Sequence, residues 1–458
     1  MIIDENKMNF YFSGIPFIFS YLVLFCFNPI DCDNIENINL HEDHLPYYFN
    51  QFPSVSAVCE KTHNCPFKKH ITKNKCWGYE SDCTRTNQYS IPRCPGDHRG
   101  WVKSKFDQQD TFYHQADFGY IKEQLEKMKL YCEPFFIDDS SLECSENLRF
   151  CRGRNLMINF TSLLERDEPI RYKMDVLSDG DIGGYCEFKK ELLDKQLDHL
   201  SPLQSWAPEF RSSFQDTWKA FTDHPILDLK DFKGKKVCFK NVVFPLLPRM
   251  IFGLYYNTPI IYGCEGSGLF DAFSKHILHR LKIPFYKRYN KKIRITFLSR
   301  ETRYRRILNE DEIVTSLNKN KHYEVQKISF NQHIPFKKQL EITRNTDIFI
   351  GIHGAGLTHL LFLPQWAAVF EVYNCEDPNC YLDLARLAGV KYFTWANASL
   401  LQTVNDGSYE GGAHAKFVNY HFDPTEFLKI VEKAAKHVKN HPSFMKLFDD
   451  TNHAHNEL

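Results

Sequence analysis

The sequence predicts an α/β protein whose second half is built around a parallel sheet. Residues 348–352 form a short apolar run rich in β-branched side chains, which is typical of a buried parallel strand. A glycine turn and a further apolar stretch follow this run. From residue 293 onward, strand and helix patterns alternate at a spacing that places helices on both faces of such a sheet.

The elements of this half follow from periodicity, capping residues and turn signals. Strands are expected at 293–298, 323–328, 348–352, 368–372 and 392–395, and helices at 310–317, 336–343, 381–387 and 424–439. A proline and a group of charged residues within 283–292 indicate a linker. We therefore expect an N-terminal domain at 45–282 and a C-terminal domain at 292–440.

The first half is less regular. Strands are expected at 156–160 and 237–239, and helices at 187–200 and 269–281. The spacing of Cys, Pro and Gly in residues 59–101 predicts a loop-rich cap held together by disulfides.

Composition excludes some functions. Lys plus Arg equals Asp plus Glu at 57 each, which argues against a general nucleic-acid binder. Hydrophobic residues make up 43% and aromatic residues 15% of the chain, which is typical of a globular protein. The chain also lacks the Gly-x-Gly-x-x-Gly pattern of a dehydrogenase after the central strand, and the Gly-x-Ser-x-Gly pattern of an esterase.

The chain ends and the cysteines predict a lumenal protein. An apolar run within residues 1–32 indicates a signal peptide, with an uncleaved anchor as the alternative; a cleaved signal leaves no stable membrane span. Most of the 15 cysteines lie in the first half without a Cys-x-x-Cys pair, which favours disulfides over a metal site. Asn159 and Asn397 begin glycosylation motifs. The last four residues resemble an endoplasmic reticulum retrieval signal read by a receptor: His455, Asn456, Glu457 and Leu458.

Polar residues after three predicted strands indicate a nucleotide diphosphate site. Arg300 follows the first strand of the second half, with Arg303, Arg305 and Arg306 close behind, and arginines can bind phosphate oxygens through two hydrogen bonds. Glu371 ends the strand after the central one, and its carboxylate could accept hydrogen bonds from the hydroxyls of a ribose. The glycine turn and helix start after the central strand would bind an anion through unpaired N–H groups; its candidate residues are His353, Gly354, Ala355, Gly356 and Thr358. The alternative to a nucleotide site is that the arginines lie on a solvent-exposed helix face and that the glycines form an ordinary strand-to-helix turn.

A pair of acids in the first half has two interpretations. Asp179 and Asp181 have the spacing that can bridge a divalent metal to a diphosphate, but a turn that favours Asp and Gly explains them better. Asp181 is nevertheless the candidate general base, because it lies in the half expected to face the acceptor.

Several motifs together resemble a known family. The chain resembles the EGF domain-specific O-linked N-acetylglucosamine transferases at four motifs. These are Ile350 to Pro364 with its His-Gly-Ala-Gly block, Glu371-Val-Tyr-Asn-Cys-Glu, Leu247-Pro-Arg-Met and the His-x-Glu-Leu tail. The related O-mannose-directed N-acetylglucosaminyltransferases share the His-Gly-Ala-Gly block. The resemblance implies two Rossmann-like domains of the GT-B glycosyltransferase type, a UDP-GlcNAc donor, and Ser or Thr hydroxyls of folded EGF-like domains as acceptors, with inversion to a β-linkage. A non-catalytic lumenal binding protein on the same fold is the other alternative.

The chain departs from the family at one motif. The family's Asp-x-Asp stands here as Asp223-His-Pro225 and has lost its second acid. This substitution gives no support for a bound divalent metal such as Mn²⁺, and it shifts stabilisation of the leaving UDP toward arginines and the helix start. Arg300 and His353 are accordingly the expected catalytic residues of the second half.

Overall fold

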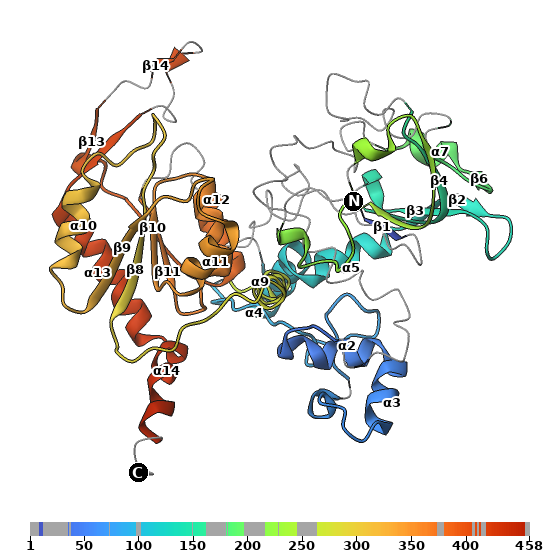
Figure 1. The fold of residues 1–458 in the computed structure, drawn as a ribbon, viewed down its shortest axis with the longest axis horizontal. Helices are drawn as coiled ribbons and strands as arrows, with labels where there is room; N and C mark the ends of the chain where they lie inside the picture. Colours follow the sequence, from blue (N-terminus) through green and yellow to red (C-terminus); the bar gives the residue numbers. More distant parts are fainter. Residues whose placement is uncertain are drawn as a thin grey trace. The chain divides into compact units, whose positions relative to one another are not determined.

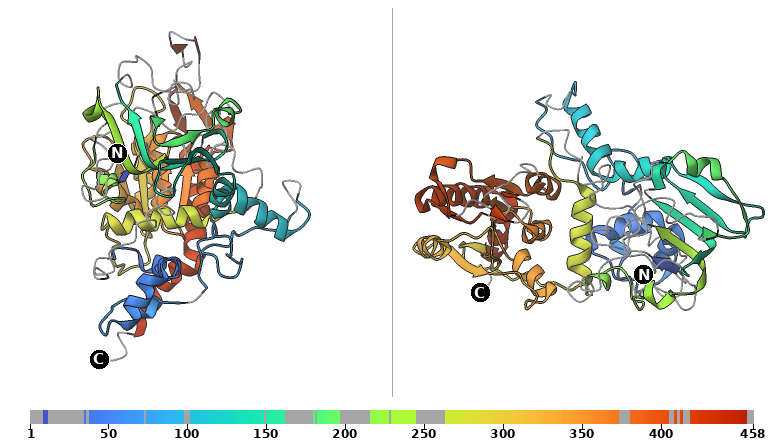
Figure 2. Two further views of the ribbon diagram at one scale, coloured as in Figure 1. Left: turned by 90° about the vertical axis from the view of Figure 1, so that its right-hand side faces the viewer. Right: turned by 90° about the horizontal axis from the view of Figure 1, so that it is seen from above.

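The computed structural model describes residues 9–11, 35, 38–72, 74–97, 102–148, 150–161, 180, 182–196, 216–227, 229–244, 263–372, 380–404, 408–409, 412–413 and 418–453. The chain divides into two compact units. The first spans Met1–Ile91, Gly96–Tyr262 and Lys275–Leu281, and the second spans Pro92–Pro95, Gly263–Ser274 and Lys282–Leu458. Helix α9 (Gly268–Arg280), yellow in Figure 2, contributes residues to both units.

The second unit contains the predicted parallel sheet. Its strand order is β12-β11-β10-β8-β9, and every neighbouring pair is parallel. The chain passes from β8 to β9 on one side, then to β10, β11 and β12 on the other. The order therefore reverses between β8 and β10, and a crevice at the carboxyl ends of such strands is where ligands bind in open α/β sheets.

The predicted elements of this unit are confirmed to within one or two residues. The strands are β8 (Ile293–Leu298), β9 (Tyr323–Ile328), β10 (Ile348–Gly351), β11 (Ala368–Glu371) and β12 (Lys391–Thr394). The helices are α10 (Glu310–Asn318), α11 (Phe336–Arg344), α12 (Cys380–Ala388) and α13 (Pro424–Asn440). A further helix, α14 (Pro442–His453), was not predicted. Short strands complete it: β13 (Leu401–Thr403), β14 (Ser408–Tyr409), β15 (Gly412–Ala413) and β16 (Tyr420–Phe422).

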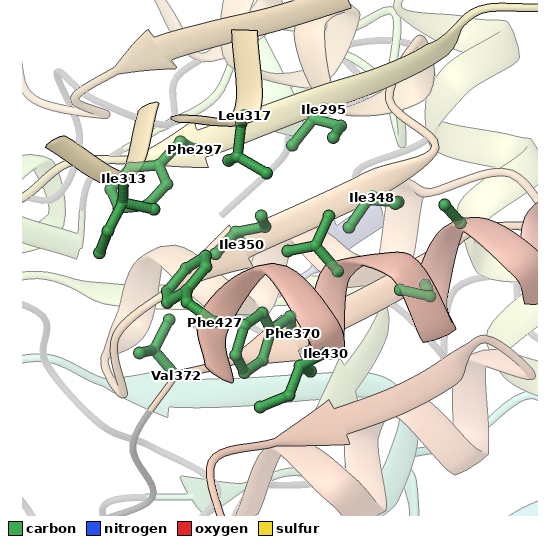
Figure 3. Close-up of a cluster of buried hydrophobic side chains, with 14 of the residues drawn as sticks. Ile295, Phe297, Ile313, Leu317, Ile348, Ile350, Phe370, Val372, Phe427 and Ile430 are labelled. Carbon is green, nitrogen blue, oxygen red and sulfur yellow. The ribbon is translucent and has the colours of Figure 1, made fainter. Parts of the chain in front are cut away.

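Helix α13 forms the core on one face of this sheet. Asp423 caps it by accepting a hydrogen bond from Glu426 N at 2.8 Å, and Pro424 occupies its first turn. Its apolar face includes Phe427 and Ile430, which pack with buried side chains of the strands (Figure 3). Helices α10 and α13 lie on one side of the sheet, and α11 and α12 lie on the other (Figure 1).

A buried ion pair fixes the amino-terminal edge of the sheet. Arg288, inside the predicted linker, donates to both carboxylate oxygens of Asp347 at 2.7 Å, and Trp366 Nε1 donates to the same carboxylate at 2.8 Å. Both charged side chains are almost fully buried, so the two charges are paired away from water, while Arg288 Nε is without a partner among the described residues. The candidate ligand-binding residues lie at the opposite edge, where the strands have their carboxyl ends.

The first unit has a different kind of sheet. Its order is β1-β7-β4-β3-β2-β6, with β5 paired to β4. Only β1 and β7 are parallel, and the other described pairs are antiparallel. The Rossmann-like sheet expected in this half is thus not found among the described strands. The strands are β1 (Asn9–Tyr11), β2 (Lys129–Pro134), β3 (Ser141–Cys144), β4 (Cys151–Asn159), β5 (Ile182–Gly183), β6 (Cys186–Phe188) and β7 (Lys236–Phe244).

The helix predicted at 187–200 is largely wrong. Of residues 187–196, only α7 (Lys190–Asp194) is helical, because the preceding residues form β6 and Cys186 is bonded to Cys132 of β2. Residues 197–200 lie outside the described residues. The remaining helices of this unit are α2 (Leu45–Gln51), α3 (Pro53–Lys61), α4 (Lys105–Ala116) and α5 (Phe118–Glu126). Among the described residues, no helix is long and apolar enough to cross a membrane.

Five disulfides among the described residues support the prediction of an oxidising compartment. Cys59–Cys65 and Cys76–Cys83 close short loops in the cap, and Cys132–Cys186 and Cys144–Cys151 join strands of the first unit. Cys94 instead pairs with Cys264 across 170 residues, and both belong to the second unit. One end of the cysteine-rich segment is therefore part of the second unit's structure.

Candidate functional site

The central strand presents a glycine turn at the switch point of the parallel sheet. All residues of β10 are buried, and the next elements are the turn at His353 and a 3₁₀ helix, η7 (Ala355–Phe362), which replaces the expected α-helix start. Gly354 precedes this helix. A Cβ atom there would lie 2.5 Å from Arg300 Nη1, so the absence of a side chain lets the arginine approach the backbone.

Two arginines converge on this turn from the loop after β8. Arg305 Nη1 donates to the backbone oxygen of His353 at 3.2 Å, and Arg300 donates from Nε to Thr302 Oγ1 at 2.7 Å. Partial burial and the nearby charge of Arg305 lower the pKa of Arg300 below its ordinary value. No carboxylate in the described part of the chain pairs with either guanidinium. The pair is therefore a concentration of positive charge suited to an anion.

The backbone of Arg305 is held in an unusual conformation. Its φ is 56°, in the left-handed region that non-glycine residues seldom adopt, and its N–H donates to Val418 O at 3.0 Å. Its Nε is buried and has no hydrogen-bond partner among the described residues. This donor, beside a second cation, is available to bind an anionic ligand.

Glu371 at the end of β11 is used differently from the expectation. Its Oε1 accepts from His353 Nδ1 at 2.5 Å, its Oε2 accepts from Tyr392 Oη at 2.5 Å, and its side chain is 1% exposed. The ribose-binding role expected for Glu371 needs an accessible oxygen, and both oxygens are engaged inside the protein. Glu371 therefore orients His353, whose ring also meets the edge of Tyr381 at 5.2 Å between centroids.

The remaining predicted donor-site residues lie at the margin. Arg303 is exposed, and its guanidinium lies over the ring of Tyr304 at 5.2 Å. Thr358 and Ala355 are exposed on η7. A Cβ atom on Gly356 would lie 2.7 Å from Leu298 Cδ2, so this glycine serves packing against β8.

Predicted residues elsewhere have simpler surroundings. Asp223 is 85% exposed and accepts from Arg280 Nη2 at 2.8 Å, in the first unit. Asn159 and Asn397 each accept, through Oδ1, from the N–H and the hydroxyl of the Thr or Ser two residues later. Asp181 and the last four residues, His455 to Leu458, lie outside the described residues.

The sequence did not single out Arg305 for the donor site, and it missed Tyr392. Arg305 was one of several arginines in a row, and only the fold of the loop selects it. Tyr392 pairs in register with Val369, two residues before Glu371, so the two side chains share a face of the sheet. That signal needs the β11–β12 register, which the sequence does not supply.

A basic, glycine-lined switch point of a parallel sheet is suited to an anionic ligand such as a phosphate group. The family model of glycosyltransferase 61 matches residues 269–370, which contain both arginines and the glycine turn. The chain is similar to the EGF domain-specific O-linked N-acetylglucosamine transferase of Drosophila melanogaster, with 47% identity over 89% of this chain and 92% of that protein. The enzyme of Rattus norvegicus is 40% identical over 89% of this chain and 91% of its own length. The enzyme of Mus musculus is 40% identical over 90% of this chain and 93% of its own length. The chain belongs to the family of EGF domain-specific O-linked N-acetylglucosamine transferases.

Proposed function

We propose that this chain transfers N-acetylglucosamine from UDP-GlcNAc to Ser or Thr hydroxyls of folded EGF-like domains, with inversion to a β-linkage. Its family membership and the printed names of its relatives support the donor sugar and the acceptor class. The observation that carries the proposal is the pair Arg300 and Arg305 beside Gly354, with no described carboxylate to neutralise them.

The second unit would bind the donor. Breaking the bond between sugar and phosphate builds negative charge on UDP, and preorganised donors aimed at that charge supply a large part of the rate. Arg300, Arg305 and the free N–H groups at the start of η7 are such donors. The divalent metal of some transferases is not needed in this scheme, and Asp223, exposed and paired with an arginine, does not fit a metal site.

The location and architecture are part of the proposal. Five disulfides, the predicted signal peptide and the C-terminal tetrapeptide support residence in the endoplasmic reticulum lumen, with a retrieval receptor as partner. The domain boundaries 45–282 and 292–440 and the two-domain GT-B arrangement are proposals too. The second unit has the parallel sheet that one half of this arrangement requires. The described strands of the first unit form a mostly antiparallel sheet, so the proposal for that half is that it faces the acceptor.

The test is a donor and acceptor screen with the purified protein. UDP release and labelled-sugar incorporation are measured with UDP-GlcNAc, UDP-GalNAc and UDP-glucose, against one folded EGF module, the same module after reduction, and an O-mannosyl peptide. We expect incorporation only with UDP-GlcNAc and the folded module. Transfer to the O-mannosyl peptide alone would assign the related activity, and UDP binding without turnover on any acceptor would favour a binding protein.

A further inference from the structure

His353, Glu371 and Tyr392 form a series of hydrogen bonds across three adjacent strands: His353 follows β10, Glu371 ends β11 and Tyr392 lies within β12. Tyr392 donates to one oxygen of Glu371, and His353 Nδ1 donates to the other, each at 2.5 Å. A carboxylate can only accept hydrogen bonds, so the proton of the neutral imidazole resides on Nδ1. The lone pair is then on Nε2, which has no hydrogen-bond partner in the part of the chain that the structure describes.

We propose that His353 Nε2 is the general base that takes the proton from the acceptor hydroxyl, with Glu371 and Tyr392 as positioning residues. This inference rests on the proposed function. It assigns the base to a group built into the donor-binding unit, in place of Asp181 of the other half. A histidine oriented by a buried carboxylate is the arrangement that activates hydroxyl nucleophiles in other enzymes.

The step balances without a further reactant. The Ser or Thr oxygen forms a bond to C1 of the sugar as the bond from C1 to the β-phosphate oxygen breaks. The hydroxyl proton moves to Nε2, and UDP leaves with the electron pair. The imidazolium that forms lies 2.5 Å from the Glu371 carboxylate, which stabilises its positive charge.

Tyr392 is linked to His353 only through Glu371, so it does not contact the reacting atoms. Glu371 is almost completely buried, and an unpaired oxygen on a buried carboxylate is costly. The Tyr392 hydroxyl satisfies that oxygen and fixes the plane of the carboxylate, which in turn fixes the imidazole ring. We therefore expect Tyr392 to affect turnover without touching either substrate.

The first experiment is the variant His353→Asn, because the Asn amide can still donate to Glu371 and keep the buried carboxylate satisfied. UDP affinity is measured by calorimetry, and kcat and KM with UDP-GlcNAc and a folded EGF module. We expect kcat to fall about 10²–10⁴-fold, with UDP affinity unchanged. Exposed His322, at the amino end of β9, gives the matched control His322→Asn, which should keep wild-type kinetics.

The positioning residues are tested by Glu371→Gln and Tyr392→Phe. Glu371→Gln removes the negative charge that stabilises the imidazolium, so kcat should fall by up to about 10⁴-fold, with partial recovery in Glu371→Asp. Tyr392→Phe should lower kcat roughly 10-fold with KM for the donor unchanged. A uniform loss of UDP affinity in these variants would show that the hydrogen bonds of His353, Glu371 and Tyr392 only support the binding site. That result would overturn the inference.

Other outcomes separate this inference from the proposed function. Lost UDP affinity in His353→Asn would make His353 a phosphate ligand instead of a base. Normal kcat in His353→Asn with strongly reduced kcat in Asp181→Asn would return the base to the other half. Either result overturns the inference while leaving sugar transfer intact. Absence of transfer by the wild-type chain would instead end the proposed function itself.

Discussion

Arg305 Nη1 donates a hydrogen bond to the backbone oxygen of His353 at 3.2 Å. This bond joins the loop after β8 to the turn after β10, the two segments that flank the point where the strand order reverses. The diphosphate site that we propose is assembled by this contact, because it brings a second guanidinium beside Arg300.

The contact distinguishes Arg305 from its neighbours. Arg305→Ala should lower kcat/KM for UDP-GlcNAc about 10²–10³-fold, because it removes a donor to the leaving phosphate and loosens the His353 turn. Arg303→Ala is the matched control, since its side chain is exposed over Tyr304. Steady-state kinetics with a folded EGF module check both variants. Equal losses in the two would place the phosphate elsewhere in the arginine loop.

Two glycines of the turn should respond differently to alanine. In Gly354→Ala the new Cβ lies 2.5 Å from Arg300 Nη1, and its φ of 160° is extended, so the strain falls on the arginine. We expect roughly a 10²-fold loss of kcat/KM with little change in Tm, as a misplaced catalytic group produces. In Gly356→Ala the Cβ meets the core side chain of Leu298, so overpacking should cost about 1–3 kcal/mol of unfolding free energy. If Gly354→Ala lowered the Tm as much as Gly356→Ala does, the distinction between a catalytic and a packing role for the two glycines would be contradicted.

Buried histidines should make the protein sensitive to acid. His44 is fully buried with both ring nitrogens unpaired, and burial followed by the charges of His276 and His41 holds its pKa well below 6.5. Burial also lowers the pKa of His276 and of His359 to about 4 each. Between pH 6.5 and 4 the unfolded chain therefore binds more protons than the folded one. Stability is fully present above pH 6.5 and falls as the pH drops toward 4.

Thermal unfolding between pH 7.5 and 5 measures this effect. His44→Phe removes one of the three groups and breaks no hydrogen bond, and its ring can keep the contacts with Trp77 and Tyr89. We expect a shallower fall of Tm with acidification in this variant. An unchanged slope would show that His44 does not contribute to the pH dependence.

The disulfide Cys94–Cys264 should matter more than those of the cap. It closes a loop of 170 residues, whereas Cys59–Cys65 closes one of 6. In chain-entropy terms the two are worth about 5 and about 2 kcal/mol. Cys94→Ser should therefore lower the Tm more than Cys59→Ser, and limited proteolysis should show the second unit opened. The reverse order of Tm values would mean that cap packing outweighs loop closure.

Transfer should not require a divalent cation. Asp223 is exposed and paired with Arg280, and the motif has lost its second acid, while Arg300 and Arg305 supply positive charge at the glycine turn. We expect activity to persist after EDTA treatment and Asp223→Asn to change kcat little. Loss of activity with EDTA, restored by Mn²⁺ in the wild type, would refute this prediction.

The sequence predicted the second unit well and the first poorly. Strands β8, β10 and β11 are short and apolar, and amphipathic helices separate the strands of the sheet, so their pattern is local and readable. In the first unit, β2 and β6 are joined through Cys132 and Cys186, 54 residues apart, and such a pairing leaves no local pattern. The helical periodicity around Glu187 was overridden by that tertiary constraint.

By itself the sequence determined the parallel sheet, the arginine-rich and glycine-rich strand ends, the oxidising compartment and the family, because each depends on local pattern or short motifs. Only the tertiary structure decided which arginine meets the glycine turn, and that Glu371 serves His353 and Tyr392 in place of a ribose. These facts depend on strand register and on the path of the loop after β8. Contacts between residues distant in the chain fix both, and no local pattern records those contacts.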